Sequence, residues 1–504
     1  MIKKHLLHYS ALAVLVILSP LLINRALVEW DGDFIDEHTL AVAVALIVAA
    51  HNRYALKIIF VINIPYALYG IVGSTYGLPS LGFFASLLDT DKVESLEFVK
   101  NIPLINWLWV FAFIVCTVVY YRTSEHKKLH KYKLLLLWVF FVAALFTSWQ
   151  VKFIRTAAKL PAEYLQHKKA LEDSLTLQDS WQVATGNNYQ KYHNYVLVIG
   201  ESLRKDYLSV YGYSHQTTPF LEKVNGTFLD NAHSMAANTV ESLTRTLQLC
   251  QPTSCNETQP QNNMVTLANK AGLNTFWISN QGKLGRYDSS TSAVALRANH
   301  PHFLKKKGFF VDNIDDMELL TQTEKILKQQ PTNNKSNLIV LHMYGSHPDV
   351  CKRLQNFKIE YNLPYDPLVN CYLATASKMD FFLNKLNGLL KKSNNSYSII
   401  YFSDHGLSLK PNRVRHNKTV KNNYQVPFFI INSDDSAHRH IAQNYSNEHF
   451  LDLFASWIGV STTKTNPQYD IFQLNNLPED KEISVYYEDR MKNLDELQSE
   501  KTLD

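Results

Sequence analysis

The chain has 504 residues, a formal net charge of +5 and 46% hydrophobic residues. This length is enough for a large domain and a second part. The mild charge, with no long basic run mixed with aromatic residues, argues against nucleic acid as a partner.

Five apolar runs in the first 150 residues predict an α-helical membrane domain. A membrane helix needs about 20 apolar residues, and four of the runs come close to that length. The run at 39–50 is short, and we expect it to form a helical hairpin with the next one, turning near residues 51–53. A buried soluble helical domain is the alternative, but five such runs exceed what a soluble core needs. The predicted spans are Tyr9–Leu27, Thr39–Ala50, Ile58–Tyr76, Pro103–Tyr121 and Leu134–Trp149.

The loops between these runs alternate in charge, which predicts the orientation of the chain. Basic residues precede the first span and follow the second and fourth, whereas the other loops are acidic or mixed. By the positive-inside rule the N-terminus is cytoplasmic, and five crossings export everything after Trp149. The first span is long and no small-residue cleavage site follows it, so we do not expect a cleaved signal peptide. The basic residues are Lys3, Lys4, Arg53, Lys57, Arg122, Lys127, Lys128, Lys131 and Lys133.

The exported part divides into a connector, residues 151–193, and a domain, residues 194–504. The connector is polar and helix-compatible, whereas from residue 194 short strands alternate with helical segments. This alternation predicts an α/β domain with a mostly parallel sheet and helices on both faces. We expect the charged stretch 478–504 to be partly loose. Strands are predicted at Tyr195–Ser202, Thr275–Asn280, Asn337–His347, Tyr397–Gly406 and Val426–Asn432, and helical spacing at 217–224, 264–272 and 372–392.

The chain has five cysteines, of which four fall in the exported part. An even number in an oxidising compartment predicts two disulfides, and a zinc ribbon is disfavoured because no C-x₂-C pair occurs. Three connectivities are possible, and we favour the local pairing Cys250–Cys255 and Cys351–Cys371. Cys116 lies inside the fourth span and is expected to be an apolar filler.

Polar residues stand where four of the five predicted strands end. They are Glu201, Asn280, His347, and Asp404 with His405. Active sites of open α/β sheets gather at the carboxyl ends of the strands. Carboxylate and imidazole ligands together suit zinc, so we predict a metal site formed by Glu201, Asp404 and His405. Taken singly, each residue is more simply a turn or a helix-terminal acid.

A metal-dependent hydrolase or transferase of this layout needs a nucleophile, and Thr239 begins the helix-compatible segment 239–247. Zinc coordination lowers the pKa of a hydroxyl, and a helix N-terminus favours a phosphoryl group. An ordinary helix cap is the alternative role for Thr239.

These motifs together resemble the phosphoethanolamine transferases, membrane-anchored members of the sulfatase-like (alkaline phosphatase-like) superfamily. The five-span anchor with an outer catalytic domain is similar too, so the resemblance covers nearly the whole chain. The matching stretches are VIGESLRKDYLSVYGY with TTPFL (198–221), NTVESL (238–243), YGSH (344–347) and SDHG (403–406).

The resemblance implies an enzyme of the bacterial inner membrane with its catalytic domain in the periplasm. Thr239 would take phosphoethanolamine from phosphatidylethanolamine and pass it to a surface glycan. Zinc, as one ion or as two during catalysis, would be held by Glu201, Thr239, Asp404 and His405. Residues implied to hold the phosphoryl group or a second metal are His347, His416, Asn280 and Lys283.

Departures from the family pattern bear on the acceptor. Members that modify lipid A carry Cys-Gly before the threonine, where this chain has Ala236–Asn238. The difference favours lipopolysaccharide core, O-antigen or a periplasmic glucan over lipid A. A phosphoglycerol transferase and a catalytically silent lipid- or glycan-binding protein are the alternatives, whereas a sulfatase is disfavoured because the CQPTS stretch at Cys250 has Ser254 where arginine is needed. We expect a monomer.

Overall fold

The computed structural model comprises two compact units, Met1–Gln166 and His167–Asp504, which divide inside helix α9 (Trp149–Thr176). Each unit is described by itself. The residues that the structure describes are 2–23, 36–76, 78–79, 84, 102–124, 131–186, 188–251, 254–282, 289–305, 314–329, 335–348, 350–359, 361–410, 413–415, 417–478, 482–488 and 490–503.

The first unit is helical, and each of the five predicted apolar runs contains a helix. Three of these helices, α1, α4 and α7, are long and apolar enough to cross a membrane, and α8 with α9 forms a bent pair that adds a fourth. Helix α3 has only 13 residues. The predicted count of five spans is therefore not confirmed among the described residues, and residues 24–27 of the first span lie outside them. The helices are α1 (Ile2–Leu21), α3 (Glu37–Ala49), α4 (Arg53–Tyr76), α7 (Leu104–Thr123) and α8 (Lys131–Thr147).

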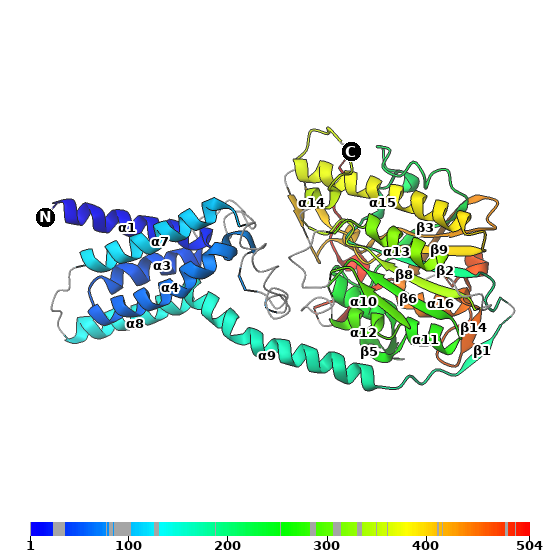
Figure 1. The fold of residues 1–504 in the computed structure, drawn as a ribbon, viewed down its shortest axis with the longest axis horizontal. Coiled ribbons are helices and arrows are strands. Elements are labelled where there is room, and N and C mark those ends of the chain that lie inside the picture. The colour runs from blue at the N-terminus through cyan, green and yellow to red at the C-terminus, as the bar shows by residue number, and fades with distance from the viewer. Residues whose placement is uncertain are drawn as a thin grey trace. The chain divides into compact units, whose positions relative to one another are not determined.

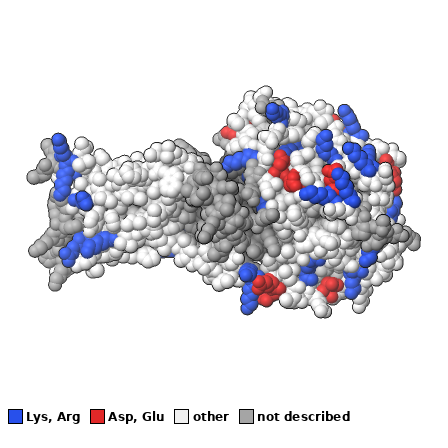
Figure 2. Space-filling view, viewed as in Figure 1, with Lys and Arg blue, Asp and Glu red and all other residues white. Residues whose placement is uncertain are grey.

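Apolar side chains face outward in this unit while polar side chains are paired inside it. Phe111, Leu135 and Val61 are each about two-thirds exposed, at 68%, 68% and 66%. The buried Gln150 amide donates hydrogen bonds to Ser19 and Asn63, at 3.2 and 3.3 Å. Figure 2 shows a largely uncharged face on this unit, with Lys and Arg gathered toward one end. This distribution is typical of helices that pack together within lipid, so the chain is membrane-anchored.

The second unit is built on an eight-stranded sheet in the order β13-β3-β12-β9-β2-β8-β6-β7. All five predicted strands belong to it. Neighbours pair in parallel throughout, except that β12 runs antiparallel to both β9 and β3. The strands are β2 (Asn194–Gly200), β3 (Gly226–His233), β6 (Asn274–Ser279), β7 (His300–Phe303), β8 (Asn337–His342), β9 (Tyr397–Ser403), β12 (Phe428–Asn432) and β13 (His438–Ser446).

Helices cover both faces of the sheet, as Figure 1 shows. Residues of α10, α11, α12 and α16 pack into one apolar core, whereas α13 and α15 pack into a second core on the other face. Strands β2 and β9 are buried along their whole length because both faces are covered. The helices are α10 (Thr239–Leu247), α11 (Met264–Lys270), α12 (Ser289–Ala295), α13 (Met317–Lys328), α14 (Val350–Leu354), α15 (Pro367–Lys392) and α16 (Phe450–Trp457).

Smaller elements surround this framework. Four two-stranded pairs join β1 (Val183–Thr185) with β14 (Val460–Thr462), β4 (Gln248–Gln251) with β5 (Ser254–Asn263), β10 (Ser408–Lys410) with β11 (Arg413–Arg415), and β15 (Ser484–Tyr487) with β16 (Arg490–Asn493). Short 3₁₀ segments lie at Lys205–Tyr207, Ser209–Tyr211, Lys421–Tyr424, Asn447–His449, Ile471–Asn476 (interrupted at Gln473) and Leu494–Glu496.

One expectation about this unit was wrong, and a second is tested only in part. Residues 217–224 form turns instead of a helix, because the hydroxyls of Thr217 and Thr218 bond the backbone of residues 209 and 210. We expected the stretch 478–504 to be partly loose, but residues 490–503 are docked on the domain, and residues 479–481, 489 and 504 lie outside the described residues. The Thr502 hydroxyl donates to Asp206, and the Leu503 amide donates to Tyr207, at 2.7 and 3.2 Å. The tail's Glu500 is also paired, with Arg204, so this charge serves a specific contact.

Both disulfides have the predicted local connectivity. Cys250–Cys255 links β4 to β5, and Cys351–Cys371 links α14 to α15. Cys116 is free and half-buried in α7, and its expected role as an apolar filler stays a prediction.

Removing the α14–α15 disulfide with the double substitution Cys351→Ser and Cys371→Ser is expected to lower stability more than removing Cys250–Cys255. The two cysteines of the α14–α15 bridge are 20 residues apart in sequence, whereas those of the β4–β5 bridge are 5 residues apart. Chain entropy then assigns them about 3 and about 2 kcal/mol of unfolding free energy. Chemical denaturation of the two double variants measures this difference. Unchanged stability without Cys351–Cys371 would contradict the bridge.

Candidate active site

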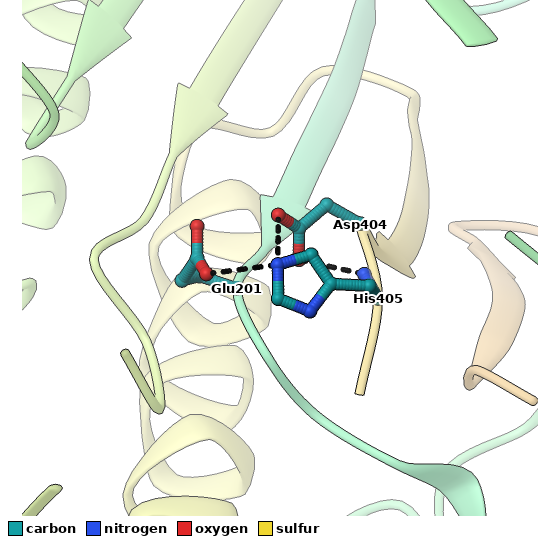
Figure 3. A group of neighbouring side chains, drawn as sticks. All are labelled: Glu201, Asp404 and His405. Carbon is teal, nitrogen blue, oxygen red and sulfur yellow. Dashed lines mark hydrogen bonds and ion pairs between the residues drawn. The ribbon is translucent and has the colours of Figure 1, made fainter. Parts of the chain in front are cut away.

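Glu201, Asp404 and His405 converge at the carboxyl edge of the sheet (Figure 3). Strands β2 and β9 pair in parallel with Gly200 opposite Ser403, so the next residues of both strands emerge side by side. All three side chains are buried. Parallel pairing of two buried strands that end in polar residues thus brings residues about two hundred positions apart into one buried cluster.

One ligand atom from each of these residues lies within 4.8 Å of the others, the spacing that a single metal ion requires. His405 Nε2 is 3.5 Å from Glu201 Oε1 and 3.4 Å from Asp404 Oδ2. The other ring nitrogen, Nδ1, lies 3.0 Å from the Gly406 carbonyl oxygen, to which it donates. This bond fixes the tautomer and leaves the Nε2 lone pair toward the acids, as in metal-binding histidines.

The two carboxylate oxygens of Asp404 differ: one accepts backbone hydrogen bonds, whereas the other could coordinate a metal ion. Oδ1 accepts hydrogen bonds from the backbone amides of Ser202 and His405, at 2.9 and 2.7 Å. Oδ2 is buried and has no hydrogen-bond partner among the described residues. A buried carboxylate oxygen in that state costs free energy unless a cation occupies the site, so the donor set fits a divalent ion.

The electrostatics of the two acids point the same way. Burial raises the pKa of Glu201 well above its usual range, and the nearby negative charge of Asp404 raises it further. Two adjacent buried carboxylates repel one another when both are ionised. A divalent cation would offset that repulsion.

Thr239 reaches the same cluster from helix α10. Its hydroxyl lies 3.2 Å from Glu201 Oε2 and 3.3 Å from His405 Nε2. Asn238 caps the helix by accepting a hydrogen bond from the Glu241 amide at 3.0 Å, and this interaction fixes where α10 begins. The Ser242 hydroxyl donates to the Asp404 carbonyl at 2.6 Å, which joins the first turn of the helix to the metal-site residues. The threonine is therefore held at the helix N-terminus, where the helix dipole favours an anion.

The turn after β2 is strained at Ser202, whose φ of 60° lies in the left-handed region. Three interactions hold it there. The Ser202 amide donates to Asp404 at 2.9 Å, its hydroxyl donates to Glu201 at 2.6 Å, and its carbonyl accepts from Tyr372 at 2.9 Å. Strain fixed by several contacts is typical of sites where side-chain position matters.

Gln281 belongs to the site although the sequence analysis did not single it out. Its side-chain amide donates to Glu201 Oε2 at 3.2 Å and to the Met343 carbonyl at 2.9 Å, and it is buried. It therefore positions Glu201 from the segment that follows strand β6. The sequence does place it next to a candidate residue, because Gln281 directly follows Asn280, where the predicted strand ends.

The loop carrying His347 packs against the backbone of Glu201. The Ser346 amide donates to the Glu201 carbonyl at 2.9 Å. The ring of His347 stacks on Tyr344 at 4.9 Å, and its Nδ1 lies 3.3 Å from the Pro348 carbonyl oxygen. Its proposed part in phosphate binding stays a prediction.

Gly345 in this loop is expected not to tolerate alanine. Its φ is 44°, and an added Cβ would lie 2.8 Å from the Glu201 carbonyl oxygen and 3.0 Å from the Glu201 Cβ. Gly345→Ala should lower the unfolding free energy by about 1–3 kcal/mol and weaken metal binding, because Glu201 must shift.

Gly388→Ala is the matched control for this substitution. That glycine lies inside α15 with open space around its Cα, so alanine should raise stability by about 0.5–1 kcal/mol. Thermal unfolding and zinc titration of the two variants test the pair. Equal behaviour would show that the loop does not position Glu201.

The remaining predicted phosphate ligands are placed as follows. Asn280 donates both of its amide hydrogens inward, to the Ile314 carbonyl and to Asp316, each at 2.8 Å. It thereby ties β6 to the segment before α13, and its part in phosphate binding stays a prediction. Lys283 and His416 lie outside the described residues.

Arg204 and Asp206, which belong to the same sequence motif as Glu201, form a buried support behind the site. The Arg204 guanidinium donates to Asp206 and to Glu500 of the C-terminal tail. Burial alone would raise the pKa of Asp206, but the charge and hydrogen bonds of Arg204 outweigh burial and hold it below its usual range. Arg204 also packs on Gly406, where an added Cβ would lie 2.3 Å from its Cγ. Arg204 therefore packs against the turn that carries Asp404 and His405 and helps to fix its position.

Comparison with known proteins assigns this architecture to a class. The sulfatase family matches residues 193–460, which covers the sheet and the site. The chain is 34% identical over 430 residues to phosphoethanolamine transferase OpgE of Escherichia coli K12, covering 80% of each chain. It is 32% identical over 363 residues to a putative phosphoethanolamine transferase of Haemophilus influenzae, covering 69% of this chain and 73% of the relative. The chain therefore belongs to the sulfatase family and, within it, to the phosphoethanolamine transferases.

Solved structures share the fold at lower identity. The periplasmic domain of E. coli EptC, in a complex with Zn, is 19% identical with a TM-score of 0.54, covering 64% of this chain and 98% of that one. The integral membrane phosphoethanolamine transferase EptA of Neisseria meningitidis is 19% identical with a TM-score of 0.53, covering 91% of this chain and 98% of that one.

Proposed function

We propose that this protein transfers phosphoethanolamine from phosphatidylethanolamine to a cell-surface glycan through a phosphorylated Thr239. The observation that carries the proposal is the Thr239 hydroxyl, 3.2–3.5 Å from a carboxylate and an imidazole that themselves form a candidate metal site. The family supports the transferred group, since the relatives over most of the chain are phosphoethanolamine transferases by name.

Zinc is the ion that the donor set fits best. Glu201, Asp404 and His405 supply two carboxylates and one imidazole, with Thr239 as a fourth group. The zinc-bound EptC domain supports this choice through its shared fold. When bound, zinc supplies the positive charge that activates a hydroxyl and offsets charge on phosphoryl oxygens.

The chain's own residues position the reaction. In the first step the Thr239 hydroxyl gives up its proton and its oxygen bonds to phosphorus, while the bond from phosphorus to the diacylglycerol oxygen breaks and that oxygen takes up a proton. In the second step an acceptor oxygen displaces Thr239, which regains its hydroxyl proton. The N-terminus of α10 favours the negative phosphoryl group throughout. Gln281 and Ser202 hold Glu201, and the Gly406 carbonyl holds His405, so neither side chain must reorganise between the steps.

The placement of the catalytic domain follows from charge. Exposed basic residues lie at the start of α1, at the start of α4 and at the end of α7. The positive-inside rule then puts the N-terminus in the cytoplasm and residues after the last span in the periplasm. Five spans, with α3 completing a hairpin with α4, satisfy this arrangement.

Mass spectrometry of the reaction tests the proposal. Purified full-length protein with phosphatidylethanolamine and a glycan acceptor should yield diacylglycerol and an acceptor heavier by one phosphoethanolamine group. A glycerol phosphate group on the acceptor would establish the phosphoglycerol alternative instead. Zinc binding without any turnover would establish the silent lipid- or glycan-binding alternative. Lipopolysaccharide core, O-antigen, lipid A and periplasmic glucan are the acceptors to compare.

Zinc affinity is expected to rise with pH. Burial and the nearby Asp404 raise the pKa of Glu201, so below that pKa the metal-free protein holds a proton on the carboxylate, and zinc binding to the ionised form releases it. Protons therefore compete at low pH, and affinity should increase about tenfold per pH unit until Glu201 ionises in the metal-free protein. Chelator competition across a pH series measures the slope, and Glu201→Gln should flatten it. A flat wild-type profile would contradict the assignment of Glu201.

A further inference from the structure

Two histidines face one another on the edge strand β13, on the opposite side of β3 and β12 from the candidate active site. His438 and His440 are two residues apart, so their side chains share one face of the strand. Their Nε2 atoms are 3.2 Å apart. Across the sheet, His440 lies opposite Phe228 of β3, Phe228 opposite Phe429 of β12, and Phe429 opposite Tyr401 of β9. Three strand spacings therefore separate the two histidines from β9, a distance of roughly 14 Å.

Each ring has its other nitrogen bound to an oxygen that can only accept. His438 Nδ1 lies 2.8 Å from the Val224 carbonyl oxygen, and His440 Nδ1 lies 2.6 Å from Asp230 Oδ1. Both Nδ1 atoms therefore carry the hydrogen. In the neutral rings both Nε2 atoms then present lone pairs to one another, and no hydrogen remains to join them. A proton on one ring, or a metal cation between the two nitrogens, resolves this conflict.

We propose that His438 and His440 bind a divalent transition-metal ion at a second site, separate from Glu201, Asp404 and His405. Two nitrogens on one tetrahedral zinc ion, each about 2.0–2.1 Å from it, are roughly 3.3–3.4 Å apart. The observed 3.2 Å matches this separation. Imidazole ligands suit copper, nickel and zinc, and water would complete the coordination of a site on the surface.

The surroundings of the pair are those of a prepared site. The hydrogen bond from His440 to the Asp230 carboxylate has the form that orients metal-binding histidines and makes Nε2 a stronger ligand. Both rings also pack on Phe228, with centroid distances of 4.6 Å for His438 and 5.3 Å for His440. Two nitrogens are thus preoriented on an exposed strand before any ion arrives.

The other edge strand supplies a matched control. His300 and His302 on β7 are also two residues apart and exposed. No hydrogen bond joins their rings in the described structure, and the ring of His300 stacks on Phe276 instead. Removing these two histidines therefore changes the composition identically without touching the proposed site.

Copper binding to the full-length protein, without an affinity tag and with one equivalent of zinc already bound, tests the proposal. Equilibrium dialysis with Cu²⁺ should find a site whose electron paramagnetic resonance spectrum shows coupling to two nitrogens. His438→Gln and His440→Gln should each weaken that site at least about tenfold and lose the two-nitrogen signal, whereas the double variant His300→Gln and His302→Gln should bind as the wild type does. Asp230→Asn keeps both nitrogens and should weaken binding about 10–100-fold.

Thermal unfolding without copper establishes that each variant is folded. Wild-type copper affinity in His438→Gln or His440→Gln would overturn the proposal. An equal loss in the His300 and His302 double variant would overturn it as well, because the effect would then follow histidine content and not this geometry.

Discussion

Thr239→Ala is expected to abolish phosphoethanolamine transfer while leaving the domain folded. The substitution removes the hydroxyl that lies 3.2 Å from Glu201 and 3.3 Å from His405, and with it the atom that would bond to phosphorus. Loss of a nucleophile should cost at least about 10³-fold in kcat. Zinc binding should weaken but persist, because Glu201, Asp404 and His405 remain. Release of diacylglycerol from fluorescent phosphatidylethanolamine measures the rate.

Thr244→Ala is the control for this substitution. Thr244 lies on the same helix, five residues further on, and its hydroxyl bonds Ser290 instead of the metal-site residues. Its replacement should leave transfer within about threefold of wild type, since this half-buried contact does not involve Glu201, Asp404 or His405. Thr239→Ser, which keeps a hydroxyl, should retain measurable activity. Transfer by Thr239→Ala at the wild-type rate would refute the nucleophile.

Asp404→Asn is expected to have opposite effects on the protein with and without metal. Asparagine keeps the acceptor for the Ser202 and His405 amides but replaces the buried Oδ2 ligand atom. Zinc affinity should fall at least about 100-fold, and transfer with it. Without metal, the free energy of unfolding of the variant should be about 1–3 kcal/mol higher than that of wild type, because a buried charge beside Glu201 is gone. Calorimetry in chelator and in zinc measures both.

Asp380→Asn separates this effect from the general loss of a buried acid. Asp380 accepts hydrogen bonds from the Phe220 and Leu221 amides, each at 2.9 Å, and burial raises its pKa to about 6. Its replacement should lower stability by about 1–2 kcal/mol equally with and without zinc, because one of two backbone hydrogen bonds is lost. If Asp404→Asn behaved in the same way, Asp404 would be a structural residue and not a ligand.

The fold was predictable where burial on both faces leaves uniform apolar strands. Strands β2, β8 and β9 read as short apolar runs ending in polar residues, and the sequence places each of them within a few residues. Strands β3 and β13 at one end of the sheet mix polar and apolar residues, since one of their faces is partly solvated, so their pattern is weak. Strand β7 is too short to show alternation. Strand β12 was predicted, but its antiparallel direction was not, because the direction of a strand leaves no mark in its composition.

The site was predictable to the extent that strand ends define it. Glu201, Asp404 and His405 follow buried strands directly, and parallel pairing forces them together. Gln281 was missed because an amide that orients a ligand has no spacing rule of its own. The docking of residues 490–503 was not predicted, because the acidic Glu500 pairs with Arg204 across nearly three hundred residues, whereas charge alone predicts solvent exposure.

Trapping the covalent intermediate tests the central claim most directly. Full-length protein incubated with phosphatidylethanolamine and no acceptor should gain the mass of one phosphoethanolamine group. Fragmentation should place the group on Thr239, and adding acceptor should remove it. An adduct on any other residue, or diacylglycerol release with no adduct on the protein at any time, would contradict the claim that Thr239 carries the transferred group.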